Sequence, residues 1–178
     1  MDYKIKRWFT VGTVFIIIFG SILHFVYEWS GNNPIVAIFG AVNESTWEHL
    51  KLLFWPAFIY SIIEYIFVGK NFNNYITAKA VSYYIGIFLI ISIFYTYTGV
   101  FGDNYLIVDI SIFIISVIIS QYIGYRITTG NYEISSILNV VSMIAIILLV
   151  LAFVLFTFYP PKIPLFQDPN SGEYGRPK

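Results

Sequence analysis

Two histidines and four carboxylates are the side chains of this sequence best suited to metal or proton chemistry. They are His24, Glu28, Glu44, Glu48, His49 and Asp109. Imidazole and carboxylate groups together suit zinc, manganese or iron, and a catalytic metal site keeps a coordination position open for water or substrate. An ionisable group within or beside an apolar run is costly to keep, so each of the six is a candidate functional residue.

The spacing of these residues suggests two sets of roles. His24 and Glu28 are four residues apart near the end of an apolar run, so a helix would place them on one face. With Asp109, they are the predicted metal ligands, and a divalent metal is the one cofactor that the residues suggest. Glu44, Glu48 and His49 are the predicted catalytic groups. A metal-free site is the alternative, in which carboxylates with separated pKa values act as acid and base and a histidine carries the proton.

Each residue taken alone also has a structural interpretation. The run Ser45-Thr-Trp-Glu48 has the pattern of a capping box, in which serine and glutamate satisfy free amides at a helix start. His24 and Glu28 could simply pair with each other, and Asp109 could hydrogen-bond a tyrosine of another helix. The functional interpretation therefore depends on convergence of the six groups around one point.

Composition identifies the class of protein. Hydrophobic residues make up 58% of the 178 positions and charged residues only 11%, against roughly 25% charged residues in soluble domains. The formal net charge is zero, and no basic cluster suggests a nucleic acid or an anionic lipid surface as a dedicated partner. Because the chain has no cysteine, thiolate nucleophiles and thiolate metal sites are excluded. The sequence predicts an integral membrane protein whose first partner is the lipid bilayer.

The predicted fold is all-α, a polytopic bundle of five transmembrane helices in a single domain, 1–178. A helix needs about 20 residues to cross the hydrocarbon core, and five apolar runs reach that length. The predicted spans are 8–27, 50–68, 80–101, 105–125 and 134–159. Segment 34–42 is apolar but too short to cross, so we expect a re-entrant or interfacial half-helix there.

Basic residues predict the orientation, because short loops rich in lysine and arginine stay in the cytoplasm. With alternating spans, most basic residues fall on the side of the N-terminus, and the connectors of the opposite side hold only Lys51. The residues on the N-terminal side are Lys4, Lys6, Arg7, Lys70, Lys79 and Arg126. We therefore predict a multi-pass protein of the cell membrane with its N-terminus inside. The candidate residues and the proline-rich tail 160–178 would then lie outside.

Three stretches resemble a family of small, uncharacterised bacterial integral membrane proteins. They are His24-Phe-Val-Tyr-Glu-Trp-Ser-Gly31, Val42-Asn-Glu-Ser-Thr-Trp-Glu-His-Leu-Lys51 and the tail from Pro160 to Gly175, with its Phe166-Gln-Asp-Pro-Asn-Ser-Gly-Glu-Tyr-Gly175. The resemblance covers nearly the whole chain. It implies a membrane topology and brings no activity, cofactor or protein partner.

Three functions remain open. The first is a metal-assisted site that acts on a lipid or small molecule at the outer face. The second is a small solute or proton-coupled transporter, in which Asp109 and a second polar layer formed by Glu64, Asn139 and Ser142 mark a path. The third is a structural or assembly protein, in which the polar groups only fix helix packing.

Overall fold

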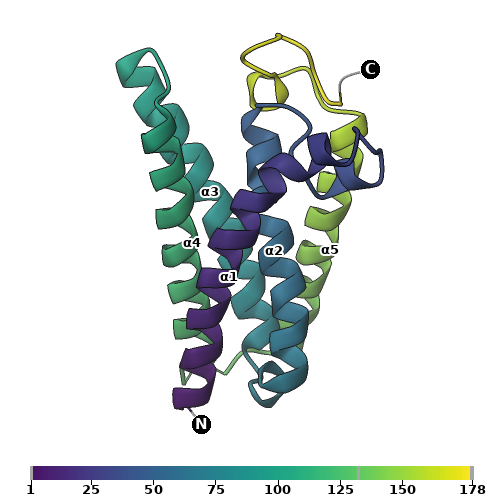
Figure 1. The fold of residues 1–178 in the computed structure, drawn as a ribbon. Coiled ribbons are helices and arrows are strands. Elements are labelled where there is room, and N and C mark those ends of the chain that lie inside the picture. The colour runs from purple at the N-terminus through teal and green to yellow at the C-terminus, as the bar shows by residue number, and fades with distance from the viewer. Residues whose placement is uncertain (1, 132, 177–178) are drawn as a thin grey trace.

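The computed structural model describes residues 2–131 and 133–176, and it arranges five long helices in one bundle (Figure 1). Their bounds are α1 Asp2–Trp29, α2 Thr46–Phe67, α3 Tyr75–Phe101, α4 Leu106–Thr129 and α5 Ser136–Phe158. All five are long and apolar enough to cross a membrane. The all-α fold with five candidate spans is thus confirmed.

One lysine that the predicted spans left in a connecting loop lies inside a helix instead. α3 begins at Tyr75, so Lys79 belongs to its first turns, whereas Lys51 belongs to α2 as the predicted span 50–68 has it. Both side chains are buried against acidic partners. The loop prediction for Lys79 was wrong because a paired lysine no longer has to reach water. The cations that still support the orientation are Lys4, Lys6, Arg7, Lys70 and Arg126.

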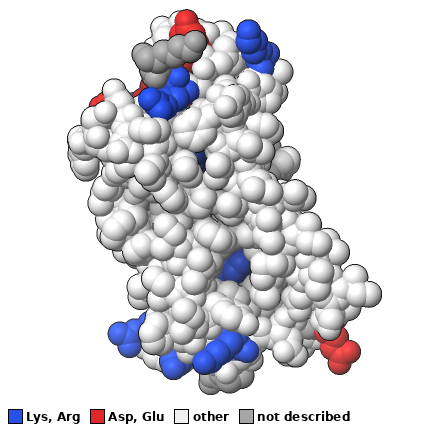
Figure 2. All heavy atoms as spheres, turned by 90° about the vertical axis from the view of Figure 1, so that its right-hand side faces the viewer, with Lys and Arg blue, Asp and Glu red and all other residues white. Residues whose placement is uncertain are grey.

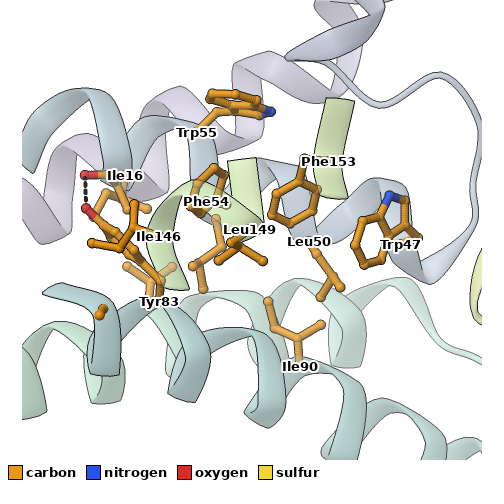
Figure 3. Packing of buried hydrophobic residues seen from close by; sticks show 14 of the residues in the cluster. Ile16, Trp47, Leu50, Phe54, Trp55, Tyr83, Ile90, Ile146, Leu149 and Phe153 are labelled. Atoms are coloured by element: carbon orange, nitrogen blue, oxygen red, sulfur yellow. Dashed lines mark hydrogen bonds between the residues drawn. The ribbon is translucent and has the colours of Figure 1, made fainter. Parts of the chain in front are cut away.

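Helix α2 lies at the centre of the bundle and is its most buried helix. Its Leu50, Leu53 and Phe54 are buried and pack against Tyr83 of α3 and Phe153 of α5 (Figure 3). Phe54 stacks on Phe153 with ring centroids 4.8 Å apart. Phe54 also meets the Tyr83 ring edge-on, with ring centroids 5.5 Å apart. Burying an aromatic side chain removes a large apolar area from solvent, so the two contacts of Phe54 join three helices into one core.

The outer faces of the bundle are apolar and mostly exposed, as expected for helices that contact lipid. Figure 2 shows a broad belt without acidic groups on its surface, between two ends where acidic and basic side chains gather. Exposed aliphatic residues such as Ile18 of α1, Ile118 of α4 and Leu148 of α5 face outward. The hydrophobic surface is therefore an outer belt, while the polar connections lie at the two ends of the bundle.

Helices α3 and α4 pack closely through small residues. Ser116, Ser120 and Gly124 are buried on one face of α4, and the Ser82 hydroxyl of α3 donates a 2.8 Å hydrogen bond to the Ser120 carbonyl. These small residues let the two helices approach closely, so this face of α4 is a packing surface. The end of this α3–α4 hairpin around 101–106 stands apart from the rest of the bundle, at the upper left of Figure 1.

At the end opposite the N-terminus, which we call the loop end, residues 30–45 and 159–176 cover α2 and α5 (Figure 1). In the segment where we expected a half-helix, only Val36–Ile38 is helical, as one 3₁₀ turn. The tail carries a second 3₁₀ turn, Pro164–Phe166, and its buried Phe166 packs on Trp47 with ring centroids 4.7 Å apart. Loop and tail thus form a folded cap over the bundle.

Candidate metal centre at the loop end

The candidate site begins where α1 approaches the backbone of α2. At Gly20 a Cβ atom would overlap the carbonyl oxygen of Leu52 and the ring of Phe113, so only glycine permits this approach. His24 lies one turn further along α1, and His49 lies near the start of α2. Their ring centroids are 5.2 Å apart. The close helix crossing therefore sets the two imidazoles side by side.

The loop that supplies the third group is anchored by a buried ion pair. Glu48 and Lys51 pair inside the first turns of α2 and are both almost fully buried. The amide of Val42 donates a 3.0 Å hydrogen bond to Glu48, and Lys51 donates to the Ala37 carbonyl at 2.8 Å. Both bonds fix the path of the loop that carries Glu44.

The tail adds a further anchor to the same loop. The Asn43 side chain donates a 2.8 Å hydrogen bond to the Gly175 carbonyl, and its Oδ1 accepts from the Ser45 amide at 2.9 Å. Lys51 also donates to Thr157 of α5 at 3.0 Å. The position of Glu44 therefore depends on contacts with α2, α5 and the tail.

Glu44 lies between the two histidines. Its Oε2 atom is 3.5 Å from Nε2 of His24 and 3.4 Å from Nε2 of His49. One ligand atom from each residue lies within 4.8 Å of the others, and this is the one such His/Asp/Glu group among the described residues. The side chains are 29%, 44% and 35% exposed for His24, Glu44 and His49, so the cluster is open to solvent.

Hydrogen bonds orient the cluster. Nδ1 of His49 donates to the Ser45 carbonyl at 2.9 Å, which directs Nε2 toward Glu44. Ser45 is also the N-cap of α2, because its hydroxyl accepts a 3.4 Å hydrogen bond from the Glu48 amide. The imidazoles of His24 and, to a lesser degree, His49 hold the pKa of Glu44 well below its usual value. Glu44 is therefore a carboxylate, the form that binds metal.

The structure brings together three of the six predicted residues, His24, Glu44 and His49, and leaves the other three apart. Glu28 is exposed in the last turn of α1, and His24 contacts Glu44. Glu48 lies beneath the cluster but pairs with Lys51. The capping prediction is confirmed for Ser45 but not for Glu48. The Glu48 carboxylate binds the Val42 amide instead of the Ser45 amide, and the Ser45 amide binds Asn43.

Asp109 lies in the first turn of α4, away from the cluster of His24, Glu44 and His49. Its carboxylate accepts hydrogen bonds from the Tyr97 hydroxyl and, at 3.1 Å, from the Asn104 amide. The Tyr97 hydroxyl in turn accepts from the Tyr105 amide at 3.2 Å. The alternative in which Asp109 binds a tyrosine is the one found, and this group closes the α3–α4 connection.

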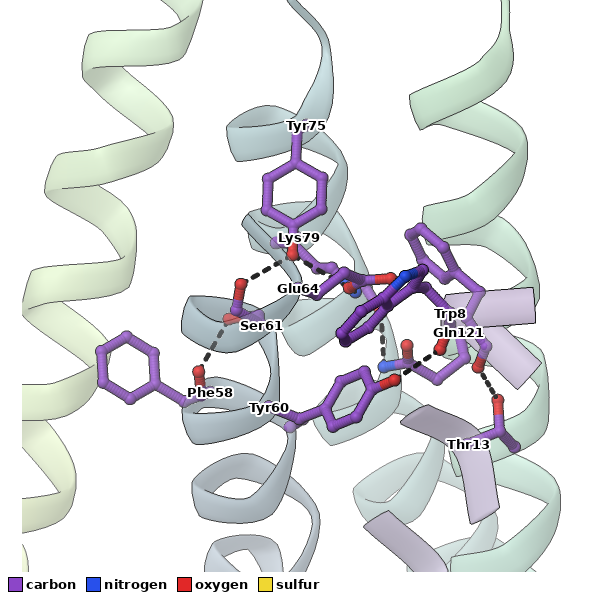
Figure 4. Close-up of polar contacts among 12 residues, drawn as sticks. Trp8, Thr13, Phe58, Tyr60, Ser61, Glu64, Tyr75, Lys79 and Gln121 are labelled. Carbon is purple, nitrogen blue, oxygen red and sulfur yellow. Dashed lines mark hydrogen bonds and ion pairs between the residues drawn. The ribbon is translucent and has the colours of Figure 1, made fainter. Parts of the chain in front are cut away.

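The second polar layer lies near the other end of the bundle (Figure 4). Glu64 is fully buried, its Oε2 lies 2.5 Å from Lys79, and it also contacts the Tyr75 hydroxyl at 2.9 Å. The transporter hypothesis grouped Asn139 and Ser142 with Glu64 in one polar layer, but both bind Thr77 instead. The sequence did contain a signal for the Glu64–Lys79 pair. It has an acid on α2 and a lysine on α3, and only a short connection lies between the two helices.

The Glu64–Lys79 pair is surrounded by protein. Lys79 lies over the ring of Phe9 at 3.9 Å, and Tyr60 beside it donates a 2.9 Å hydrogen bond to the Trp8 carbonyl (Figure 4). A buried pair that satisfies its own charges fixes the relation of the helices that carry it. The pair therefore joins the α2–α3 hairpin and holds it against α1.

Comparison with known proteins gives one match. A family model described as a family of unknown function (DUF6512) matches residues 1–176. No curated protein and no solved structure matches the chain. The comparison therefore supports membership of a family. Any assignment of chemistry has to come from the geometry of the site.

Proposed function

The chain belongs to the family of unknown function DUF6512, and we propose that it is a membrane protein that binds a divalent transition metal ion at its loop end. The ligands are Nε2 of His24, Nε2 of His49 and the carboxylate of Glu44. Among the sequence predictions, His24 keeps its role as a ligand. Glu44 and His49 move from catalytic groups to ligands.

The separations among these atoms carry the proposal. Metal–ligand bonds of about 2.0–2.2 Å at tetrahedral angles separate neighbouring ligand atoms by about 3.3–3.6 Å. The two measured separations from Glu44, 3.5 Å and 3.4 Å, fall in that range. Two imidazoles and one carboxylate are also the donor set of several catalytic zinc sites. The ligand atoms of all three residues lie within 4.8 Å of one another.

The second support is the orientation of His49. Histidines that bind metals usually donate their other ring N–H to a carbonyl or carboxylate, which fixes the ring and raises the basicity of the ligand nitrogen. The bond from Nδ1 of His49 to the Ser45 carbonyl at 2.9 Å supplies this contact.

Three protein ligands leave at least one coordination position open. The cluster is partly exposed, and the exposed side chains of Phe25 and Trp29 follow His24 on α1. Aromatic residues of this kind are typical of the membrane interface. We therefore propose that the open position takes an oxygen atom of a lipid or small molecule at this level, which the ion polarises.

The geometry favours the structural role over transport for the remaining acids. The Glu64 pair and the loop-end cluster are separated by buried apolar residues of α2, including Leu53, Phe54 and Ala57. A proton or solute path would need polar groups or water across that layer. We assign Glu64 and Asp109 to helix packing.

The test is metal content and affinity of the purified protein. We expect one zinc or manganese ion per chain by elemental analysis, removable by a chelator. His24→Ala/His49→Ala should abolish binding, while Glu28→Gln, an exposed acid one turn away on α1, should bind as the wild type does. Titration of the stripped protein should raise the midpoint of thermal unfolding, because a ligand at about 100 times its Kd adds about 2.7 kcal/mol.

The proposal fails if the wild-type protein and the double histidine variant bind the ion equally. It also fails if stripped protein binds none of zinc, manganese and iron(II) while its unfolding remains cooperative. The three residues would then be a carboxylate bridging two imidazoles.

A further inference from the structure

The N-terminal turns of α1 border two hollows at the end of the bundle opposite the metal site. One, of about 270 Å³, is lined by Tyr3, Lys6, Arg7, Thr10 and Val11. The other, of about 290 Å³, is lined by Lys4, Arg7, Trp8, Val11 and Tyr60. Arg7 and Val11 border both, and the second hollow lies between α1 and α2.

The rim of the hollows is basic. Lys4, Lys6 and Arg7 are exposed, and none of them forms an ion pair with an acidic side chain among those the structure describes. The sequence shows no basic run long enough to suggest an anionic partner, but the helix gathers these cations around a concave surface. They present positive charge that no described carboxylate of this protein offsets.

The floor of the second hollow is rigid and aromatic. The Tyr60 hydroxyl donates a 2.9 Å hydrogen bond to the Trp8 carbonyl, and Trp8 stacks on Phe67 with ring centroids 5.5 Å apart. These contacts hold the rings of α1 and α2 in place. A preformed floor lowers the entropic cost of binding.

The character of the surface changes from charged to apolar within two turns. Val11 and Val14 are about half exposed, and they follow Arg7 by one and two helical turns, or about 6 and 10 Å of helical rise. A phospholipid has the same order of groups, with a charged phosphate at the interface and an acyl chain below it. A soluble anion would use only the basic rim.

We propose that the hollow between α1 and α2 binds the headgroup of an anionic phospholipid, with its phosphate at Lys4 and Arg7 and an acyl chain along Val11 and Val14. Basic pockets between transmembrane helices are a known type of anionic-lipid site. Lys6 adds charge from the adjoining hollow. This site is independent of the metal centre and stands whether or not the protein binds an ion.

The test is a lipid titration of the detergent-purified full-length protein, followed by native mass spectrometry. Phosphatidylglycerol and phosphatidylcholine with identical acyl chains are compared. We expect one phosphatidylglycerol to bind at least about tenfold more tightly than phosphatidylcholine. In Lys4→Gln/Arg7→Gln the preference should fall about tenfold or more, since each basic residue near a membrane surface contributes about 1 kcal/mol.

Control variants distinguish lipid binding at the hollow between α1 and α2 from general electrostatic attraction of anionic lipid to this end of the bundle. Lys70→Gln removes one exposed charge at the same end of the bundle and should keep the preference, as should the charge-conserving Arg7→Lys. Glycerol phosphate at millimolar concentration should not displace the lipid. Equal binding of the two lipids by the wild type, equal losses in Lys70→Gln and the double variant, or displacement by glycerol phosphate would each overturn the proposal.

Discussion

The two polar layers of this bundle use similar side chains in opposite ways. Near the N-terminal end, Glu64 is buried with Lys79 and Tyr75, and protein surrounds the pair. At the loop end, Glu44 lies between two histidines that remain partly exposed. The first arrangement is closed off by protein, whereas the second is open to solvent. The partner and exposure of an acid, rather than its presence in a membrane helix, therefore indicate its role.

The largest effect should come from breaking the closed layer. Lys79→Met would leave Glu64 buried without its cation, which we expect to destabilise the protein by about 3–5 kcal/mol. Glu64→Gln/Lys79→Met removes both charges and should recover much of that loss. Thermal unfolding in detergent measures both variants. A Lys79→Met protein as stable as the wild type would show that the pair does not hold the hairpin.

The buried Glu48–Lys51 pair connects stability to the open layer. Lys51→Met should cost about 3 kcal/mol and should also weaken zinc binding about tenfold, although Lys51 is not a ligand, because the loop that carries Glu44 loses its anchor. Calorimetric titration of stripped protein measures the affinity. An unchanged zinc affinity in a destabilised variant would show that the Glu48–Lys51 pair does not set the position of Glu44.

The helix crossing at Gly20 offers a smaller perturbation. Gly20→Ala places a methyl group against the Leu52 carbonyl and the Phe113 ring, which should cost about 1–3 kcal/mol. It should also separate His24 from His49 and lower zinc affinity. Gly99→Ala is the control, because no atom lies within 4 Å of a Cβ at that position. Equal zinc affinity in the two variants would exclude the crossing as the feature that sets the imidazoles.

Asp109 is a third acid that can be compared with Glu64 and Glu44. Tyr97→Phe removes one hydrogen bond from its carboxylate and should cost about 1 kcal/mol, with no change in metal content. Elemental analysis beside thermal unfolding would detect both. A loss of bound metal would return Asp109 to the set of ligands.

The smallest effect should be the response of the open layer to acid. The pKa of Glu44 is lower in the folded protein than its usual value, so its contribution to stability is present above the unfolded pKa and is lost as pH falls through the folded one. Metal-free wild-type protein should therefore lose more thermal stability between pH 5 and 3 than Glu44→Gln does. Because Glu44 is partly exposed, the difference should be small. Equal losses of thermal stability in the two proteins between pH 5 and 3 would contradict this.

The fold was predictable because the membrane leaves few alternatives. An apolar run of about 20 residues must form a helix to satisfy its backbone in hydrocarbon, and five such runs define the bundle. The helix ends were less predictable. Lys79 lies inside α3 because its partner on α2 offsets the cost of burial, and hydropathy along one helix contains no information about a neighbour.

The candidate site was predictable in its residue types and only partly in its membership. Helical spacing suggested that His24 would meet Glu28, but Gly20 brings α1 onto α2, and the loop inserts Glu44 instead. That loop path depends on a bond from Asn43 to Gly175, far along the chain. Local periodicity describes neighbours on one helix and cannot describe a contact that the tail completes.

The bond between Asn43 and Gly175 also constrains the order of assembly. Residues of the tail emerge from the ribosome long after the connection between the first two candidate spans, and they reach it only once α5 is in place. Until then, all five helices of a nascent chain can be inserted while the cap formed by the loop and the tail is still incomplete. Membrane insertion and maturation of the loop end are therefore separate events, and a chain cut short after α5 would complete the first without the second.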